Sequence, residues 1–79
     1  MTPIQCRMAR AALGWSTADL ARSANVGGNT VNRFESGQDA RVSSVRKMRV
    51  AMEAAGVEFI AENGGGPGVR LAKVRDDKR

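Results

Sequence analysis

Apolar residues recur at intervals of three and four through the first two thirds of the chain, the spacing of helices with one buried face. Residues typical of helix starts and helix ends separate these stretches. The pattern predicts four short helices, over residues 3–13, 17–24, 28–36 and from a cap at Ser43 or Ser44 to residue 55. We expect these side chains to be buried: Cys6, Ala9 and Leu13; Leu20, Ala21 and Ala24; Val31 and Phe34; Val45, Met48, Met52 and Ala55.

The first two predicted helices carry strong start signals. Thr2 and Gln5, and then Ser16 and Asp19, are three residues apart, which is the spacing of a capping box. Trp15 precedes the second cap and is placed to pack on the helix that follows, so we interpret it as a packing residue and not as a base-stacking one.

The periodicity changes after Gly56. Residues 57–62 and 69–74 alternate imperfectly between apolar and polar, and a glycine-rich segment, 63–68, separates them. This pattern predicts a β-hairpin over residues 57–75, followed by a charged tail, 76–79. The segment 63–68 precedes a strand and lacks the Lys-Ser/Thr of a phosphate-binding loop, so we interpret it as a turn. The predicted fold is mainly α: a helical part, 1–56, and the hairpin, within one compact domain.

The composition restricts the class of function. The chain has 79 residues and a net charge of +5, and residues 1–56 hold eight basic against four acidic residues. This balance favours a polyanion such as nucleic acid. The chain has no histidine, and its one cysteine, Cys6, is expected to be an inert core residue that forms no disulfide. We therefore expect a cytoplasmic protein that is not an enzyme and has no cofactor, metal, membrane span or small-molecule substrate.

Three segments of the helical part resemble a known family. Residues 13–21 (LGWSTADLA), 26–31 (VGGNTV) and 33–37 (RFESG) are similar, in register, to the phage repressor and Cro-type (xenobiotic-response-element, XRE-type) helix-turn-helix family. The resemblance covers about residues 2–57. It implies a lambda-repressor-like bundle whose third helix, 28–36, enters the major groove of double-stranded DNA. It also implies a transcriptional regulator, most simply a repressor, that binds as a homodimer.

The outer face of the predicted third helix suits base reading. Amides pair well with adenine, and an arginine pairs in bidentate fashion with guanine. The resemblance assigns base reading to Gly28, Asn29, Asn32 and Arg33, and phosphate contacts to Ser16, Thr17, Thr30, Ser36, Arg41, Ser43 and Ser44. Asn32 and Arg33 would also suit an ordinary solvated face. The basic cluster at residues 46–49 suits either phosphate contact or a solvated face.

Two further features follow from the resemblance. The family pairs the positions of Arg10 and Glu35 in a largely buried ion pair that joins the first helix to the third. Where the family usually has a capping serine and then a polar reader, this chain has Gly27 and Gly28. The glycine pair predicts a helix start that DNA binding would order.

The hairpin is the candidate for contacts with another protein. We expect its exposed edge to pair with a second copy and to bury Phe59, Ile60 or Leu71. An alternative is an antitoxin-like module, in which the hairpin binds a small partner toxin and the protein represses its own operon.

Overall fold

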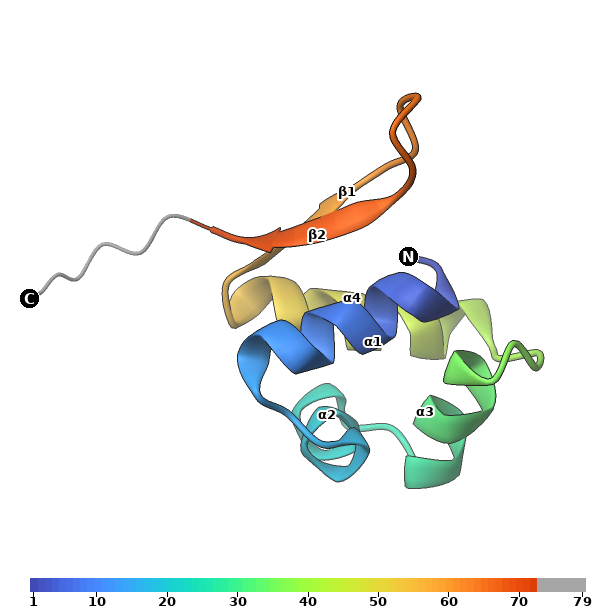
Figure 1. Cartoon of the computed structure of the whole chain (residues 1–79). Coiled ribbons are helices and arrows are strands. Elements are labelled where there is room, and N and C mark those ends of the chain that lie inside the picture. The colour runs from blue at the N-terminus through green and yellow to red at the C-terminus, as the bar shows by residue number, and fades with distance from the viewer. Residues whose placement is uncertain (73–79) are drawn as a thin grey trace, which may run out of the picture.

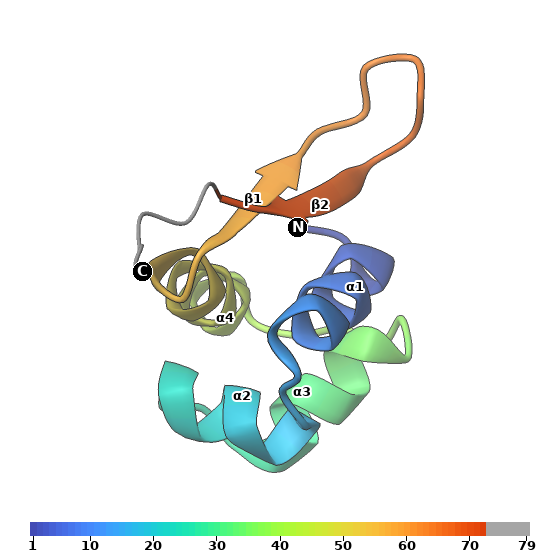
Figure 2. The ribbon, with the colours of Figure 1, turned by 60° about the vertical axis from the view of Figure 1, so that its left-hand side comes forward.

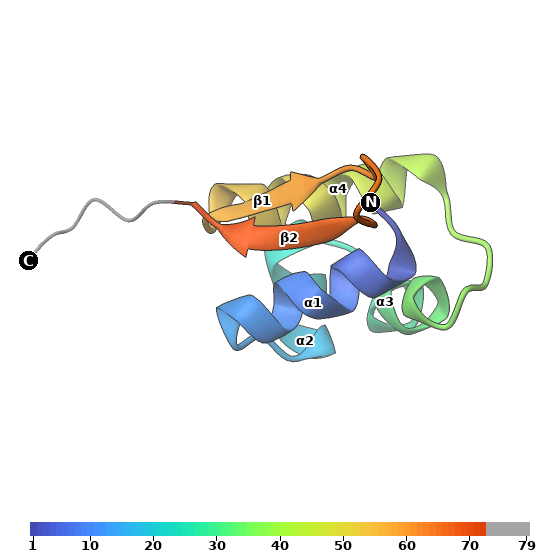
Figure 3. The same ribbon diagram turned by 45° about the horizontal axis from the view of Figure 1, so that its top comes forward.

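The computed structural model describes residues 1–72, which form four helices followed by a two-stranded antiparallel hairpin. The elements are α1 (Pro3–Leu13), α2 (Thr17–Ala24), α3 (Gly28–Glu35), α4 (Val42–Ala54), β1 (Val57–Ile60) and β2 (Gly68–Leu71). The hairpin lies over α1 and α4, and α2 and α3 lie on the opposite side of that helix pair (Figures 1, 2 and 3). The predicted mainly helical fold with a C-terminal hairpin is confirmed.

Local hydrogen bonds define both ends of α1 and α2, as the sequence predicts. The Thr2 hydroxyl oxygen accepts the Gln5 backbone N–H at 3.1 Å, and the Gln5 side chain accepts the Thr2 backbone N–H at 2.9 Å. Ser16 and Asp19 form the same reciprocal pair at 3.0 and 2.9 Å. The helices end at Gly14 and Asn25, which adopt positive φ angles of 70° and 58°. Left-handed backbone at these positions lets backbone N–H groups bond the last helix carbonyls and turns the chain.

The core lies where the helical stripes converge. Its largest fully buried side chains come from all four helices: Leu20, Met48, Met52, Val31 and Cys6. Trp15 is partly buried and packs against this core, in agreement with its interpretation as a packing residue. Three of the predicted core residues, Leu13, Phe34 and Val45, are only partly buried and pack against this core. The prediction for Ala55 is wrong: it is exposed, because α4 ends at Ala54 and the chain turns there.

The predicted cap of α4 is also wrong. The helix begins at Val42, and Ser43 and Ser44 lie inside its first turn. The Val45 N–H donates to the Arg41 carbonyl at 3.0 Å, which makes Arg41 the N-cap. A serine cap would need extended backbone at the serine itself and would break that first helical bond. At the end of α3 the difference is smaller, because Ser36 is the C-cap and not the last helical residue.

The strands are shorter than predicted. Val57 pairs with Leu71 and Ile60 with Gly68, so pairing stops before residues 61–62. The Glu62 carboxylate accepts the backbone N–H groups of Gly64 and Gly66 at 3.1 and 3.2 Å, which folds the chain into a loop in place of the ladder. Residues 73–75 of the predicted hairpin and the tail 76–79 lie outside the described residues.

One buried amide attaches the hairpin to α1. The Gln5 side chain, in a residue only 4% exposed, donates to the carbonyls of Ile60 and Gly68 at 2.9 and 3.0 Å. The same face of the hairpin carries Val57, which is buried, and Phe59, which packs against the core.

Candidate nucleic-acid interface

The outer face of α3 is polar and open to solvent. Val31 and Glu35 are buried on the inner side of the helix, whereas all four predicted base-reading residues are exposed: Gly28, Asn29, Asn32 and Arg33. Helical geometry places these four on one side, because the pairs 28/32 and 29/33 are one turn apart. Three residues, 25–27, separate α2 from α3, so the two helices form a helix-turn-helix (Figure 1).

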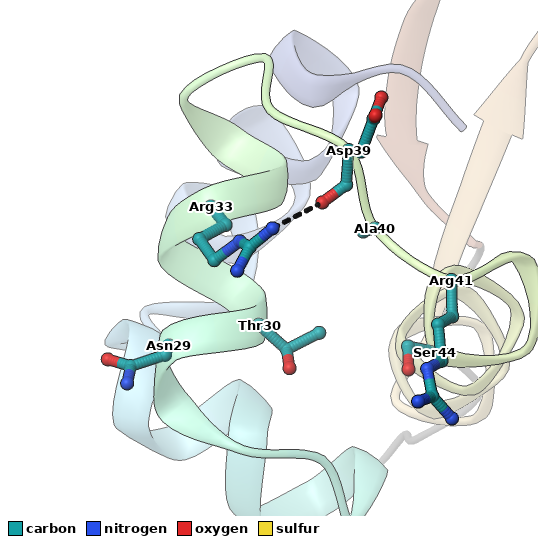
Figure 4. Close-up of a pocket in the computed structure, with 7 residues that line it drawn as sticks. All are labelled: Asn29, Thr30, Arg33, Asp39, Ala40, Arg41 and Ser44. Atoms are coloured by element: carbon teal, nitrogen blue, oxygen red, sulfur yellow. Dashed lines mark hydrogen bonds between the residues drawn. The ribbon is translucent and has the colours of Figure 1, made fainter.

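A groove runs beside this face, between α3 and the start of α4. Its volume is about 440 Å³, and its lining combines α3 residues with the loop that follows: Asn29, Thr30, Arg33, Asp39, Ala40, Arg41 and Ser44 (Figure 4). The groove brings together two predicted base readers and three predicted phosphate contacts. These residues offer an amide, two guanidinium groups and two hydroxyls, all hydrogen-bond donors suited to a polyanion.

Asp39, in the loop before α4, also lines this groove. The Arg33 guanidinium donates to the Asp39 backbone carbonyl at 3.4 Å (Figure 4). That distance exceeds the usual range for an N–H···O bond, so the contact is weak and leaves Arg33 free to turn toward a ligand. No sequence signal marks the pairing, because the loop conformation alone brings a carbonyl six residues downstream back to α3.

The other six predicted residues do not line the groove. Gly28 and Asn32 lie on the exposed face of α3 beyond it, and Ser43 is exposed in the first turn of α4. The Ser36 hydroxyl donates to the Asn32 carbonyl at 2.8 Å, so its proton is already used within the helix. Thr17 is partly buried at the first position of α2.

The start of α2, the other predicted phosphate contact, holds its own carboxylate. The backbone N–H of Ser16 donates to the Asp19 side chain, and with the Ser16 hydroxyl and Arg22 it holds the pKa of that carboxyl below its usual value. The Ser16 hydroxyl oxygen accepts the Asp19 N–H. The Asp19 charge opposes a phosphate at this helix start, and Arg22 balances it.

A buried ion pair fixes α3 against α1. Arg10 donates through Nε and Nη2 to the two carboxylate oxygens of Glu35 at 2.7 and 2.8 Å, as the resemblance implies. A third donor of Arg10, Nη1, reaches the Trp15 carbonyl at 3.1 Å. Because the two parallel bonds to Glu35 are bidentate, they restrain the orientation of α3 as well as its distance from α1.

Two more α1 side chains reach Glu35. The Cys6 thiol donates to its carboxylate at 3.1 Å, and Arg7 donates to its backbone carbonyl at 2.6 Å. Burial raises the pKa of Glu35, but the hydrogen bonds from Arg10 and Cys6 and the charges of Arg10 and Arg7 outweigh burial and leave that pKa lowered. Burial, reinforced by the Glu35 carboxylate, raises the pKa of Cys6 to about 12.

Comparison with protein-family models and with curated protein sequences finds no match to this chain. Within residues 1–72, no three His, Cys, Asp or Glu side chains are grouped so that they could hold a metal ion. None of the helices described is long and apolar enough to cross a membrane.

Proposed function

We propose that the chain is a sequence-specific, double-stranded DNA-binding transcriptional regulator of the phage repressor and Cro type, acting as a repressor. In this proposal α3 enters the major groove. Asn29, Asn32 and Arg33 read base edges there, and Gly28 lets the backbone approach closely. Thr30, Arg41 and Ser44 contact phosphates from the rim of the adjoining groove.

One observation carries the proposal. The exposed face of α3 joins a groove lined by donors from α3, the following loop and α4, in the part of the chain that holds eight basic against four acidic residues. A base-reading helix needs protruding amides or guanidinium groups, and it needs flanking donors that fix its position on the phosphate backbone. This arrangement supplies both.

We further propose that the protein binds DNA as a homodimer joined through the hairpin. A single short helix covers few base pairs, whereas two copies about 34–36 Å apart would read successive turns of the duplex. The hairpin lies on the side opposite α2 and α3, so hairpins paired edge to edge around a two-fold axis would leave both α3 helices facing one way (Figure 2). Leu71, at the end of β2, is 52% exposed and available for that contact.

Selection from a random duplex DNA library at two salt concentrations tests the function. We expect a near-palindromic motif whose recovery weakens as salt rises, because phosphate contacts release counterions. Salt-sensitive binding to all sequences, without any selected motif, would contradict sequence-specific recognition. The positive charge would then account only for a general attraction to polyanions.

Arg33→Ala separates base reading from folding. We expect DNA binding to weaken by about 1–3 kcal/mol and specificity to relax at one base pair of each half-site, with an unchanged melting temperature. Fluorescence anisotropy on the selected site and on single-base variants measures both effects. Glu35→Ala is the contrasting variant, because it should lower the melting temperature by leaving the Arg10 charge without its ion-pair partner. If the two variants behave alike, the separation into reader and scaffold is wrong.

Leu71→Lys tests the dimer. A lysine on a strand edge opposes edge-to-edge pairing, so sedimentation equilibrium should give a monomer at concentrations where the wild-type protein is a dimer. Val42→Lys is the matched control, since Val42 is an even more exposed valine on α4. A dimer lost only with Val42→Lys would move the interface to α4. A wild-type monomer that binds a second small protein through the hairpin would support the antitoxin-like alternative.

A further inference from the structure

The outward side of α4 carries two exposed valines, Val42 and Val50, that no other described element covers. Val42, Arg46 and Val50 follow one another at four-residue intervals and therefore form one ridge along the helix. Val42 is 84% exposed and Val50 is 54% exposed, which makes them two of the four large exposed hydrophobic residues described. Lys47 and Arg49 flank the ridge; these five residues are called the α4 surface below. Figure 2, which views α4 nearly along its axis, shows α1, the hairpin and α2 around its other sides.

A groove lies on each side of the ridge. One has a volume of about 500 Å³, and its apolar lining comes from Met1, Ala40, Val42, Val45 and Val50. The other, of about 490 Å³, runs between α2 and α4 over Ala24, Val50, Ala51 and Ala54. A ridge between two apolar grooves is the shape that another helix packs against, with its own side-chain rows in the grooves.

The charge around this apolar strip is positive. Arg46 lines both grooves, and Lys47 lines the groove toward α2. Arg49 donates to Glu53 at 3.0 Å and lies 5.8 Å from the centre of the Phe59 ring, so the acidic residue of this region is already paired. Three cations against one carboxylate leave an excess of positive charge around the valines.

This charge selects the occupant. In a two-fold pairing of α4 with a second copy, the central Arg46 of each chain would lie near the other, and like charges would be brought together. Residues 73–79 hold four basic and two acidic residues, so they also fail to complement the surface. We propose that the α4 surface binds an acidic amphipathic helix of a partner protein, whose apolar side chains fill the grooves while its carboxylates meet Arg46 and Lys47.

The α4 surface is separate from the candidate DNA interface. Ser44, which lines the DNA-facing groove, is two residues after Val42 and therefore points about 200° around the helix from it. The DNA-facing groove and the groove lined by Met1 and Val42 share one lining residue, Ala40, on the loop between α3 and α4. The partner and DNA would thus be bound at the same time, and the proposal does not depend on the DNA-binding function.

Backbone amide NMR of the full chain tests the proposal with synthetic helical peptides. The probe has leucines along one face and glutamates on the flanks, and its control has the same leucines with lysines in place of the glutamates. We expect saturable shifts at residues 42–54 with the acidic peptide and none with the basic one. The double variant Arg46→Glu/Lys47→Glu should weaken binding by about tenfold or more, because two attractive contacts become repulsive. Arg22→Glu, at an exposed cation on α2, should leave it unchanged.

Several results would overturn the inference. Equal binding of both peptides would show that the α4 surface binds apolar helices without regard to charge. Shifts confined to α3 would place the acidic peptide in the candidate DNA interface. Concentration-dependent shifts at the α4 surface without peptide would assign this face to a second copy. Loss of duplex DNA binding in the double variant, with peptide binding intact, would assign both cations to phosphate contacts. Circular dichroism melts check that the variants are folded, as expected for exposed positions.

Discussion

At the scale of single residues, Glu35 is the junction on which the orientation of α3 depends. It is 7% exposed, and it accepts hydrogen bonds from three side chains of α1. The resemblance implied the contact with Arg10, but the contacts with Cys6 and Arg7 are visible only in the fold. The carboxylate itself accepts from Arg10 and Cys6, and these bonds stabilise the native state while the carboxylate is ionised.

Acid should therefore weaken the fold through Glu35. Its pKa is lower in the folded chain than the ordinary value of 4.5, so its contribution is complete above that pH and is lost as the pH falls through the folded-state pKa. Urea unfolding followed by Trp15 fluorescence should give a stability difference between wild type and Glu35→Gln that narrows from pH 6 to pH 3. Asp19 is present in both proteins, so its contribution to the pH dependence cancels in the stability difference. A difference independent of pH would contradict the assignment.

At the scale of elements, the helices differ in how their first turns are secured. α1 and α2 have complete capping boxes, whereas α3 begins at Gly27 without a side-chain cap. Gly27 has φ −71° and ψ 150°, a conformation open to any residue, and a Cβ there would meet only the Thr30 hydroxyl at 3.8 Å. The glycine is thus not required by the backbone, and it weakens the start of the candidate recognition helix.

Gly27→Ser should stabilise the protein. A serine cap and a less flexible unfolded chain together should add about 0.5–1 kcal/mol, which raises the melting temperature by about 2–8 °C for a domain of this size. Differential scanning calorimetry measures the change. Gly14→Ser is the matched control and should destabilise, because Gly14 has φ 70°. Stabilisation by both variants would mean that the effect is not one of capping.

At the scale of the whole molecule, the position of the hairpin depends on a polar contact inside an apolar interface. Gln5 serves two elements: its Oε1 completes the cap of α1, and its Nε2 binds two carbonyls at the far end of the hairpin. The cap follows from sequence spacing. The second contact joins residues 55 and 63 positions apart, and no local pattern predicts it.

Gln5→Leu should loosen the hairpin. It leaves two carbonyls without this donor, and we expect a loss of about 1–3 kcal/mol together with faster hydrogen exchange in residues 57–71. Thr2→Ala is the control: it removes the same capping box, at a cost of about 1 kcal/mol, and keeps the Gln5 amide. Equal exchange rates in the two variants would show that the amide does not hold the hairpin in place.

The sequence by itself determined the features that depend on neighbouring residues. Helix starts at Thr2 and Ser16, ends at Gly14 and Asn25, and the change of period after Gly56 could all be predicted, because capping and periodicity act over a few residues. The inner and outer faces of α3 follow from the same periodicity.

Only the tertiary structure decided the contacts between distant segments. The loop geometry brings Asp39 to Arg33. Helix α4 begins at Val42, where the Val45 N–H bonds the Arg41 carbonyl, and not after the serines that the sequence favours as caps. The hairpin ends early because Glu62 bonds the loop glycines, and Gln5 reaches across to it. The open ridge on α4 is likewise a result of assembly, since a pattern marks which residues are apolar but not which of them find a partner.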